Sequence, residues 1–171
     1  MSGRTQVEEF TELVNSRWPT LVRAALLMGC PRAEAEDVVQ AALTRCFQNW
    51  GLIRRAETPD AYVHRILVNT FVDRTRRRSY GEVPVAELRP VDVGGRGTDL
   101  DLRMDLDAAL RRLSSAQRIV VVLRYYLDLS ERETAAALGV PAGTVKSRLA
   151  RGLAALAVDL APDPAEPGGQ S

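Results

Sequence analysis

The chain has 171 residues, a formal net charge of +1, two cysteines and one histidine. This length is enough for one ordinary domain or two small ones with a working hydrophobic core. The near-neutral charge argues against a protein that coats nucleic acid, and two widely spaced cysteines are too few for a zinc site. We therefore expect Cys30 and Cys46 to be buried thiols, and we expect no metal and no cofactor.

The sequence contains no signal for a membrane. No apolar stretch approaches the roughly 20 residues that a membrane-spanning helix needs. The N-terminus, MSGRTQVEEF, lacks the basic and apolar regions of a signal peptide. We expect a cytoplasmic protein without membrane insertion.

Two helical blocks flank a stretch without sustained periodicity, SYGEVPVAELRPVDVGGRGT. Its proline, glycine and short apolar pairs are typical of a flexible linker, and the proline- and glycine-rich C-terminus is typical of a disordered tail. The predicted fold class is all-α, with two small helical domains. The predicted boundaries are a domain over 2–78, a linker over 79–99, a domain over 100–160 and a tail over 161–171.

The first block contains three helices by the spacing of its apolar residues. One covers residues 7–27 and is interrupted at Pro19; a second covers residues 32–50. The third follows the sequence TPD, with Thr58 or Asp60 as its N-terminal cap. A single histidine, His64, lies beside the basic side of this helix, where a structural role is the expectation.

Positive charge is concentrated around the third helix. Between residues 54 and 78, seven arginines stand against three acidic residues. The arginines are Arg54, Arg55, Arg65, Arg74, Arg76, Arg77 and Arg78. A focused excess of this kind favours contact with phosphates, although a basic helix end also suits the helix dipole.

The second block begins with an amphipathic helix, after which Ser114 can cap the next one. That next helix contains IVVVLRYY, whose β-branched residues alone would favour a buried strand. We predict a helix, because a single strand among helices would have no partner.

The segment LSERETAAALGVPAGTVKSRLARGLAAL predicts a helix-turn-helix. Ser130 and Glu133 form a capping box, and Gly139 suits the left-handed turn that ends the first helix. On the second helix, Val145 and Leu149 face inward. The outward residues that can bond to base edges or phosphates in a major groove are Thr144, Lys146, Ser147, Arg148 and Arg151. The alternative is an ordinary solvated helix face.

These motifs resemble those of a known family. The helix-turn-helix is similar to region 4 of bacterial sigma-70 factors. The segments AEAEDVVQAALTRCFQNW and TPDAYVHRILVNTFVDRTRRR are similar to region 2 of the extracytoplasmic-function (ECF) group. The resemblance covers residues 6–158 and implies a region 2 bundle of three or four helices and a region 4 helix-turn-helix.

The resemblance implies a core-polymerase surface on the AEDVVQ helix. The family docks this helix on the clamp coiled coil of the largest polymerase subunit, and contacts to the flap of the second subunit are also implied. The candidate residues are Asp37, Gln40, Ala41, Thr44 and Arg45. For Asp37 the alternative is a favourable charge near the helix N-terminus.

The resemblance also implies a minus-10 surface on the RILVNT helix, which would hold an unpaired strand. The candidate residues are Arg65, Asn69, Asp73, Arg76 and Arg77. Arg74 and Arg78 could also neutralise phosphates, and the loop GLIRRAETPD could receive an extruded base. For Asn69 the alternative is an amide satisfied within the bundle. Unlike many relatives, the chain has no tryptophan near Arg74 or Thr75, so stacking capacity there is reduced.

The function implied is a promoter-specificity subunit that binds core polymerase, reads the minus-35 element and melts the minus-10 element. Such a protein is not an enzyme and takes no small-molecule substrate, and an anti-sigma factor is implied as a further partner. The alternative is a stand-alone helix-turn-helix transcriptional regulator.

Overall fold

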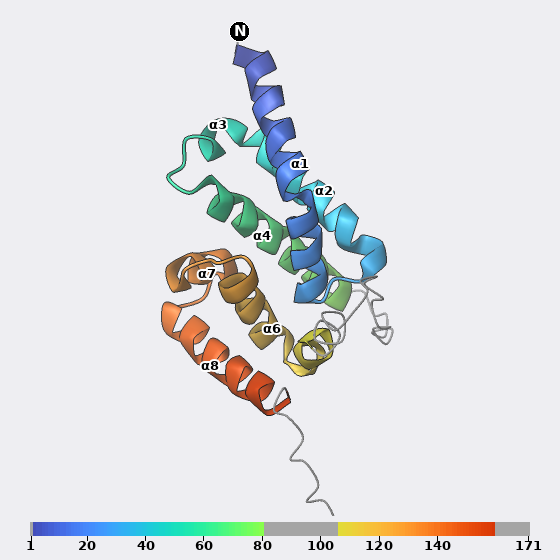
Figure 1. Ribbon diagram of the computed structural model, residues 1–171, viewed down its shortest axis with the longest axis vertical. Coiled ribbons are helices and arrows are strands. Elements are labelled where there is room, and N and C mark those ends of the chain that lie inside the picture. Colours follow the sequence, from blue (N-terminus) through green and yellow to red (C-terminus); the bar gives the residue numbers. More distant parts are fainter. Residues whose placement is uncertain (1, 81–105, 160–171) are drawn as a thin grey trace, which may run out of the picture.

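The computed structural model describes residues 2–80 and 106–159, and every regular element within these ranges is helical (Figure 1). The prediction of an all-α protein with two small helical domains is therefore confirmed. The predicted C-terminal tail and most of the predicted linker lie outside the described residues.

The N-terminal domain consists of α1 (Ser2–Met28), α2 (Arg32–Gln48), α3 (Trp50–Ile53) and α4 (Pro59–Tyr80). The interruption predicted at Pro19 is wrong, because α1 continues through this residue. A proline inside a helix removes one hydrogen bond and costs about 3 kcal/mol. Burial of Leu21, Ala24 and Ala25 against the other helices offsets this cost.

Helix α4 begins at Pro59, inside the sequence TPD rather than after it. Thr58 takes the cap position, with its carbonyl accepting from the backbone N–H of Tyr62 (3.4 Å). Pro59 opens the helix, where its missing N–H is no loss. Asp60, the other candidate cap, lies in the first turn and pairs with Arg17 of α1.

Helices α1, α2 and α4 pack around a common core that includes the fully buried Leu21, Val38 and Leu67. Near the N-terminal end of α1, the centroid of the Phe10 ring lies 5.1 Å from the ring centroid of Phe47 and 5.3 Å from that of Trp50. These aromatic contacts join α1 to α2 and to the short helix α3.

The C-terminal domain contains a helical stretch over residues 106–112, then α6 (Ser115–Val121), η1 (Val122–Tyr126), α7 (Glu131–Leu138) and α8 (Ala142–Asp159). The segment IVVVLRYY is helical, as predicted, and its second half is a π-helix. Its β-branched side chains are accommodated because Val120, Val121 and Val122 pack into the core. Tertiary burial here outweighs local strand propensity.

The two domains pack against each other and share one hydrophobic core. Leu110, Leu113 and Leu123 belong to the same cluster as Leu21 and Leu67 of the N-terminal domain. Helix α4 lies against α7, and α1 lies against α6 and η1 (Figure 1).

Candidate nucleic-acid interface

The helix-turn-helix begins and turns at the predicted residues. Ser130 Oγ accepts from the backbone N–H of Glu133 (3.2 Å), and the Glu133 carboxylate accepts from the backbone N–H of Ser130 (2.7 Å). Gly139 ends α7 with φ 64°, a left-handed conformation that costs glycine little. Both predictions, the capping box and the glycine turn, are confirmed.

A small core fixes the two helices of the motif relative to each other. Val145 of α8 is fully buried against Val120 and Ala135, and Val140 of the turn and Leu149 pack on the same cluster. The inward face predicted for Val145 and Leu149 is present. Because α8 is held by this packing, its opposite face has a defined orientation.

The outward face of α8 carries the five predicted residues. Lys146, Ser147 and Arg151 are exposed, whereas Thr144 and Arg148 are half-buried. The hydroxyl of Ser147 donates to the carbonyl of Thr144 (3.1 Å). Within the described part of the chain, none of the three basic side chains pairs with a carboxylate. The face therefore offers uncompensated positive charge.

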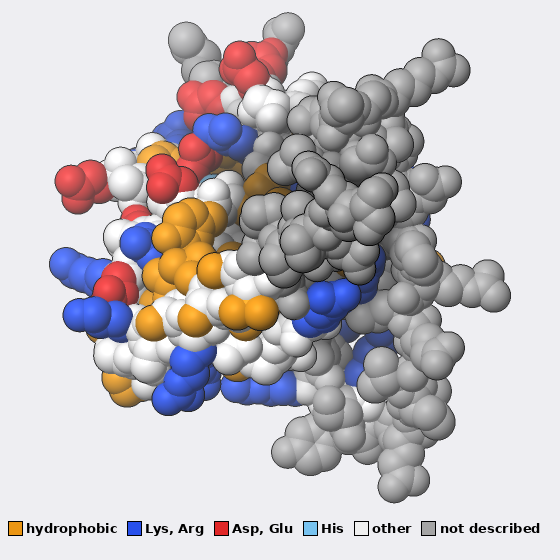
Figure 2. Space-filling model, turned by 60° about the horizontal axis from the view of Figure 1, so that its bottom comes forward, with side chains coloured by type: hydrophobic (Ala, Val, Ile, Leu, Met, Phe, Trp, Pro, Cys, Tyr) orange, Lys and Arg blue, Asp and Glu red, His pale blue; other side chains and the backbone are white. Residues whose placement is uncertain are grey.

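Figure 2 turns the α8 end of the molecule toward the viewer. Lys and Arg side chains without Asp or Glu beside them lie along the lower edge of this face, whereas higher on the face Lys and Arg side chains are mixed with Asp and Glu.

The predicted minus-10 residues form a single stripe along α4. Arg65, Asn69, Asp73 and Arg77 follow at steps of four residues and Arg76 lies beside them, so they share one helix face. All five side chains are exposed. We call this set the α4 stripe. Its position and exposure suit contact with a strand that passes along the helix.

The arginines of this region fall into two groups that the sequence does not separate. Arg74 lies 3.5 Å from Glu34 and 3.8 Å from Asp37 of α2, and Arg78 also pairs with Glu34. Among the described residues, Arg65, Arg76 and Arg77 have no acidic partner. Arg74 and Arg78 hold α2 against α4, which leaves the other three available to phosphates.

The five residues predicted to face polymerase form one exposed face of α2. They are Asp37, Gln40, Ala41, Thr44 and Arg45. The hydroxyl of Thr44 donates to the carbonyl of Gln40 (2.9 Å), and the Val38, Val39 and Leu43 side chains on the other side are buried. Two members also contact α4, namely Asp37 through Arg74 and Arg45 through Thr70 and Asp73.

The α4 stripe and the outward face of α8 belong to different parts of the molecule. Helix α7 lies between α4 and α8 and packs against both (Figure 1). The structure thus brings together the residues within each predicted surface, but it does not join the two surfaces into one.

The single histidine and the two cysteines are buried. His64 lies on α4, and its burial lowers its pKa. Cys30 and Cys46 are buried free thiols. Burial raises the pKa of Cys30 to about 11 and that of Cys46 to about 12, so both stay protonated at neutral pH.

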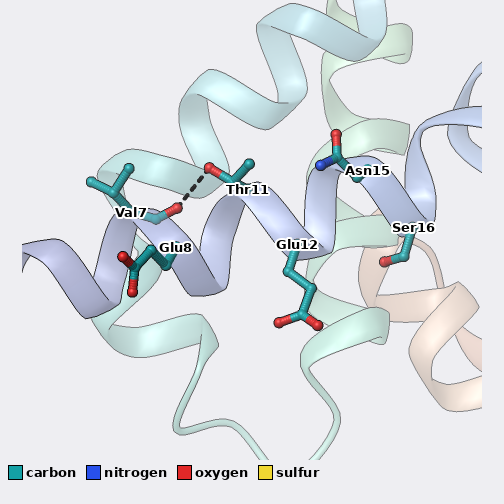
Figure 3. Close-up of a pocket in the computed structure, with 6 residues that line it drawn as sticks. All are labelled: Val7, Glu8, Thr11, Glu12, Asn15 and Ser16. Atoms are coloured by element: carbon teal, nitrogen blue, oxygen red, sulfur yellow. Dashed lines mark hydrogen bonds between the residues drawn. The ribbon is translucent and has the colours of Figure 1, made fainter.

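A shallow depression on α1 offers no convergent chemistry. Its lining residues come from one face of this helix alone: Val7, Glu8, Thr11, Glu12, Asn15 and Ser16 (Figure 3). Thr11 bonds to the carbonyl of Val7 within the helix. Across residues 2–80 and 106–159, no group of acidic, histidine or cysteine side chains could hold a metal, and no helix could cross a bilayer.

Two contacts between helices could not be predicted from the sequence. Arg118 of α6 donates to the carbonyls of Leu26 and Leu27 at the end of α1, and Arg45 bonds across to α4. Both arginines stand in ordinary amphipathic helices. No local signal identifies their partners, which lie 91 or 92 residues away for Arg118 and 25 residues away for Arg45.

Comparison with known proteins agrees with this geometry. The family model "Sigma-70 region 2" matches residues 13–80, and "Sigma-70, region 4" matches residues 103–156. The RNA polymerase sigma-E factor of Streptomyces coelicolor is 40% identical over 158 residues, which cover 91% of this chain and 88% of that protein. The ECF RNA polymerase sigma factor SigM of Mycobacterium tuberculosis is 34% identical over 149 residues, or 86% of this chain and 75% of that protein.

Solved structures show the same fold. The sigma factor RpoE of Bartonella quintana, crystallised with the anti-sigma factor NepR, matches with a TM-score of 0.72 over 91% of this chain and 99% of its own, at 24% identity. CnrH, solved with the cytosolic domain of CnrY, matches with a TM-score of 0.57 over 87% of this chain and 85% of its own, at 26% identity.

The family matches define this two-domain helical protein as a DNA-binding transcription protein. The chain belongs to the sigma-70 family of RNA polymerase sigma factors. Its relatives identify it further as a member of the ECF group. The resemblance in the sequence is confirmed, and promoter-specific transcription is the function of the family.

Proposed function

We propose that the two basic surfaces act on two promoter elements: α8 reads the minus-35 duplex, and the α4 stripe holds the opened minus-10 strand. The observation that carries this proposal is the segregation of arginines. Arg74 and Arg78, which join α4 to α2, are paired with acidic residues, whereas the basic residues on α8 and three on the α4 stripe have no acidic partner in the described part of the chain.

The outward face of α8 has the groups that base-edge readout requires. Arginine and lysine pair with guanine edges or with phosphates, and serine or threonine can bond to either. Arg148 is half-buried at the centre of this face, so its guanidinium has less conformational freedom than that of Arg151. Arg148 is therefore our principal candidate for base readout.

The α4 stripe has the groups that hold a single strand. The Asn69 amide can donate to and accept from a base edge, and the Arg65, Arg76 and Arg77 side chains can neutralise phosphates. With an aromatic residue at neither position 74 nor position 75, stacking contributes less there than charge does.

The exposed face of α2 is the proposed site for core polymerase. Its side chains project from a helix that α1 and α4 hold in place. We propose that Asp37, Gln40, Ala41, Thr44 and Arg45 face the clamp coiled coil of the largest subunit and that the C-terminal domain faces the flap. The protein then acts in the cytoplasm and supplies recognition, while polymerase supplies the chemistry.

An anti-sigma factor is the proposed regulator. Two proteins of the same fold were solved as complexes: the sigma factor RpoE with the anti-sigma factor NepR, and CnrH with the cytosolic domain of CnrY. A partner of this kind would compete with polymerase for the protein.

The test is transcription in vitro from a promoter library, with core polymerase alone, this protein alone and the two together. We expect transcripts only from the mixture, all from promoters that share two spaced motifs. Tight duplex binding by the protein alone, with no transcription that depends on core polymerase, would refute the proposal in favour of a stand-alone helix-turn-helix regulator.

A further inference from the structure

Arg45 links the proposed polymerase helix α2 to the α4 stripe. Its Nη1 atom donates to Thr70 Oγ1 (3.1 Å) and lies 3.6 Å from a carboxylate oxygen of Asp73. Thr70 is buried, and its hydroxyl donates to the carbonyl of Ile66 (2.8 Å), which fixes the oxygen that accepts from Arg45. The guanidinium is therefore anchored on α4 at two points.

Asp73 is the one acidic member of the α4 stripe. It follows Asn69 by one helical turn, and about half of its side chain is exposed. An unpaired carboxylate at this position would repel the phosphates of a strand that passes Asn69. The Arg45 guanidinium reduces this repulsion, because it places a positive charge 3.6 Å from the carboxylate.

We infer that Arg45 is a positioning residue for the minus-10 strand. It acts through Asp73, whose charge it neutralises. The inference rests on the proposed function and refines it: the stem of Arg45 lies on the polymerase face, while its charged end serves the DNA surface. The ligand class is a single-stranded nucleic acid backbone.

The test uses full-length protein in holoenzyme with a promoter selected from the library and labelled with 2-aminopurine in the minus-10 element. Arg45→Met is compared with Asp73→Asn and with the double variant. We expect Arg45→Met to lower the rate of strand opening about three- to tenfold at low salt, with a smaller loss at high salt. Asp73→Asn should restore most of this rate in the double variant, when core polymerase is supplied at a concentration that saturates all three proteins.

Arg74→Met is the matched control. Arg74 also joins α4 to α2, through Glu34 and Asp37 at 3.5 and 3.8 Å, but these partners lie outside the α4 stripe. Any opening defect of Arg74→Met should not be relieved by Asp73→Asn.

Three results would overturn the inference. The first is an additive effect of Arg45→Met and Asp73→Asn on the opening rate, and the second is equal relief of the Arg74→Met defect by Asp73→Asn. The third is an Arg45→Met opening defect that disappears at saturating core polymerase. A wild-type holoenzyme that opens no promoter would instead refute the proposed function, so the two failures are distinguishable.

Discussion

The guanidinium of Arg118 donates a hydrogen bond to the carbonyl of Leu26 (3.2 Å) and a second to that of Leu27, at the C-terminal end of a helix in the other domain. The last carbonyls of a helix have no partner within it and carry partial negative charge, so a cation there is favourable. Gly29 follows with φ 105°, and an added Cβ at this residue would meet the Arg118 guanidinium at 3.4 Å. The C-terminal domain thus caps α1 of the N-terminal domain.

Arg118→Met should weaken this contact between the domains. The loss of hydrogen bonds that involve a charged group predicts a decrease of about 1–3 kcal/mol in the free energy of unfolding. Urea denaturation followed by the fluorescence of Trp18 and Trp50 measures the decrease. Arg132→Met, at an exposed position of α7, is the control and should change stability by less than about 0.5 kcal/mol. Equal stability of the two variants would contradict the capping role.

His64 should make stability depend on pH. Burial lowers its pKa in the folded state; nearby Asp60 and Glu133 oppose this effect, whereas Arg17 reinforces it. The unfolded chain therefore binds a proton more readily, and stability is lost as pH falls below about 6.5. Unfolding measured between pH 8 and pH 5 checks this, with His64→Gln as the comparison. A wild-type slope no steeper than that of His64→Gln would show that His64 does not contribute.

Two glycines of α8 should respond to alanine in opposite directions. At Gly152 an added Cβ would lie 3.0 Å from Val121 Cγ2, where α8 packs on α6. At Gly143 it would meet nothing within 4 Å. Gly143→Ala should raise the free energy of unfolding by up to about 1 kcal/mol, because alanine has the higher helix propensity. Gly152→Ala should lower it by about 1 kcal/mol, because the cost of overpacking exceeds that gain. Thermal unfolding compares them, and stabilisation by both would mean that α6 yields to the added methyl group.

The capping box of the helix-turn-helix should contribute about 1 kcal/mol to the free energy of unfolding. Ser130→Ala removes the acceptor for the Glu133 backbone N–H, and typical losses at such caps are about 0.5–2 kcal/mol. Ser130→Asp keeps an acceptor at the same position and should retain most of the stability. Hydrogen exchange of the first α7 amides gives a local readout. Unchanged exchange in Ser130→Ala would show that the cap is dispensable.

Arg148→Ala should weaken binding to the minus-35 duplex. If its guanidinium makes a bidentate contact with a base, the binding free energy falls by about 1–3 kcal/mol, and the preference for one base pair of the duplex relaxes. Binding of holoenzyme to duplexes with single substitutions measures both effects. Arg17→Ala, in α1 of the other domain, should bind as the wild type does. Unchanged preference in Arg148→Ala would exclude Arg148 from base readout.

Local pattern was enough to place most elements and the outward face of the helix-turn-helix, whereas the candidate surfaces on α2 and α4 came from the resemblance to sigma factors. The capping box at Ser130, the turn at Gly139 and the inward position of Val145 depend on hydrogen bonds and helix periodicity within a few residues. The same periodicity places Asn69 and Asp73 on one face of α4. These features are visible in the sequence because their partners are close along the chain.

Tertiary structure decided two features: that α1 continues through Pro19, and which arginines contact acidic residues. Helix propensity alone predicts a break at Pro19, but burial of neighbouring residues outweighs one lost hydrogen bond. Arg74 and Arg77 look equivalent in the sequence, yet only Arg74 faces the acidic residues of α2. Which side chains meet across two helices depends on how those helices cross, and this follows from packing of the whole core rather than from any local segment.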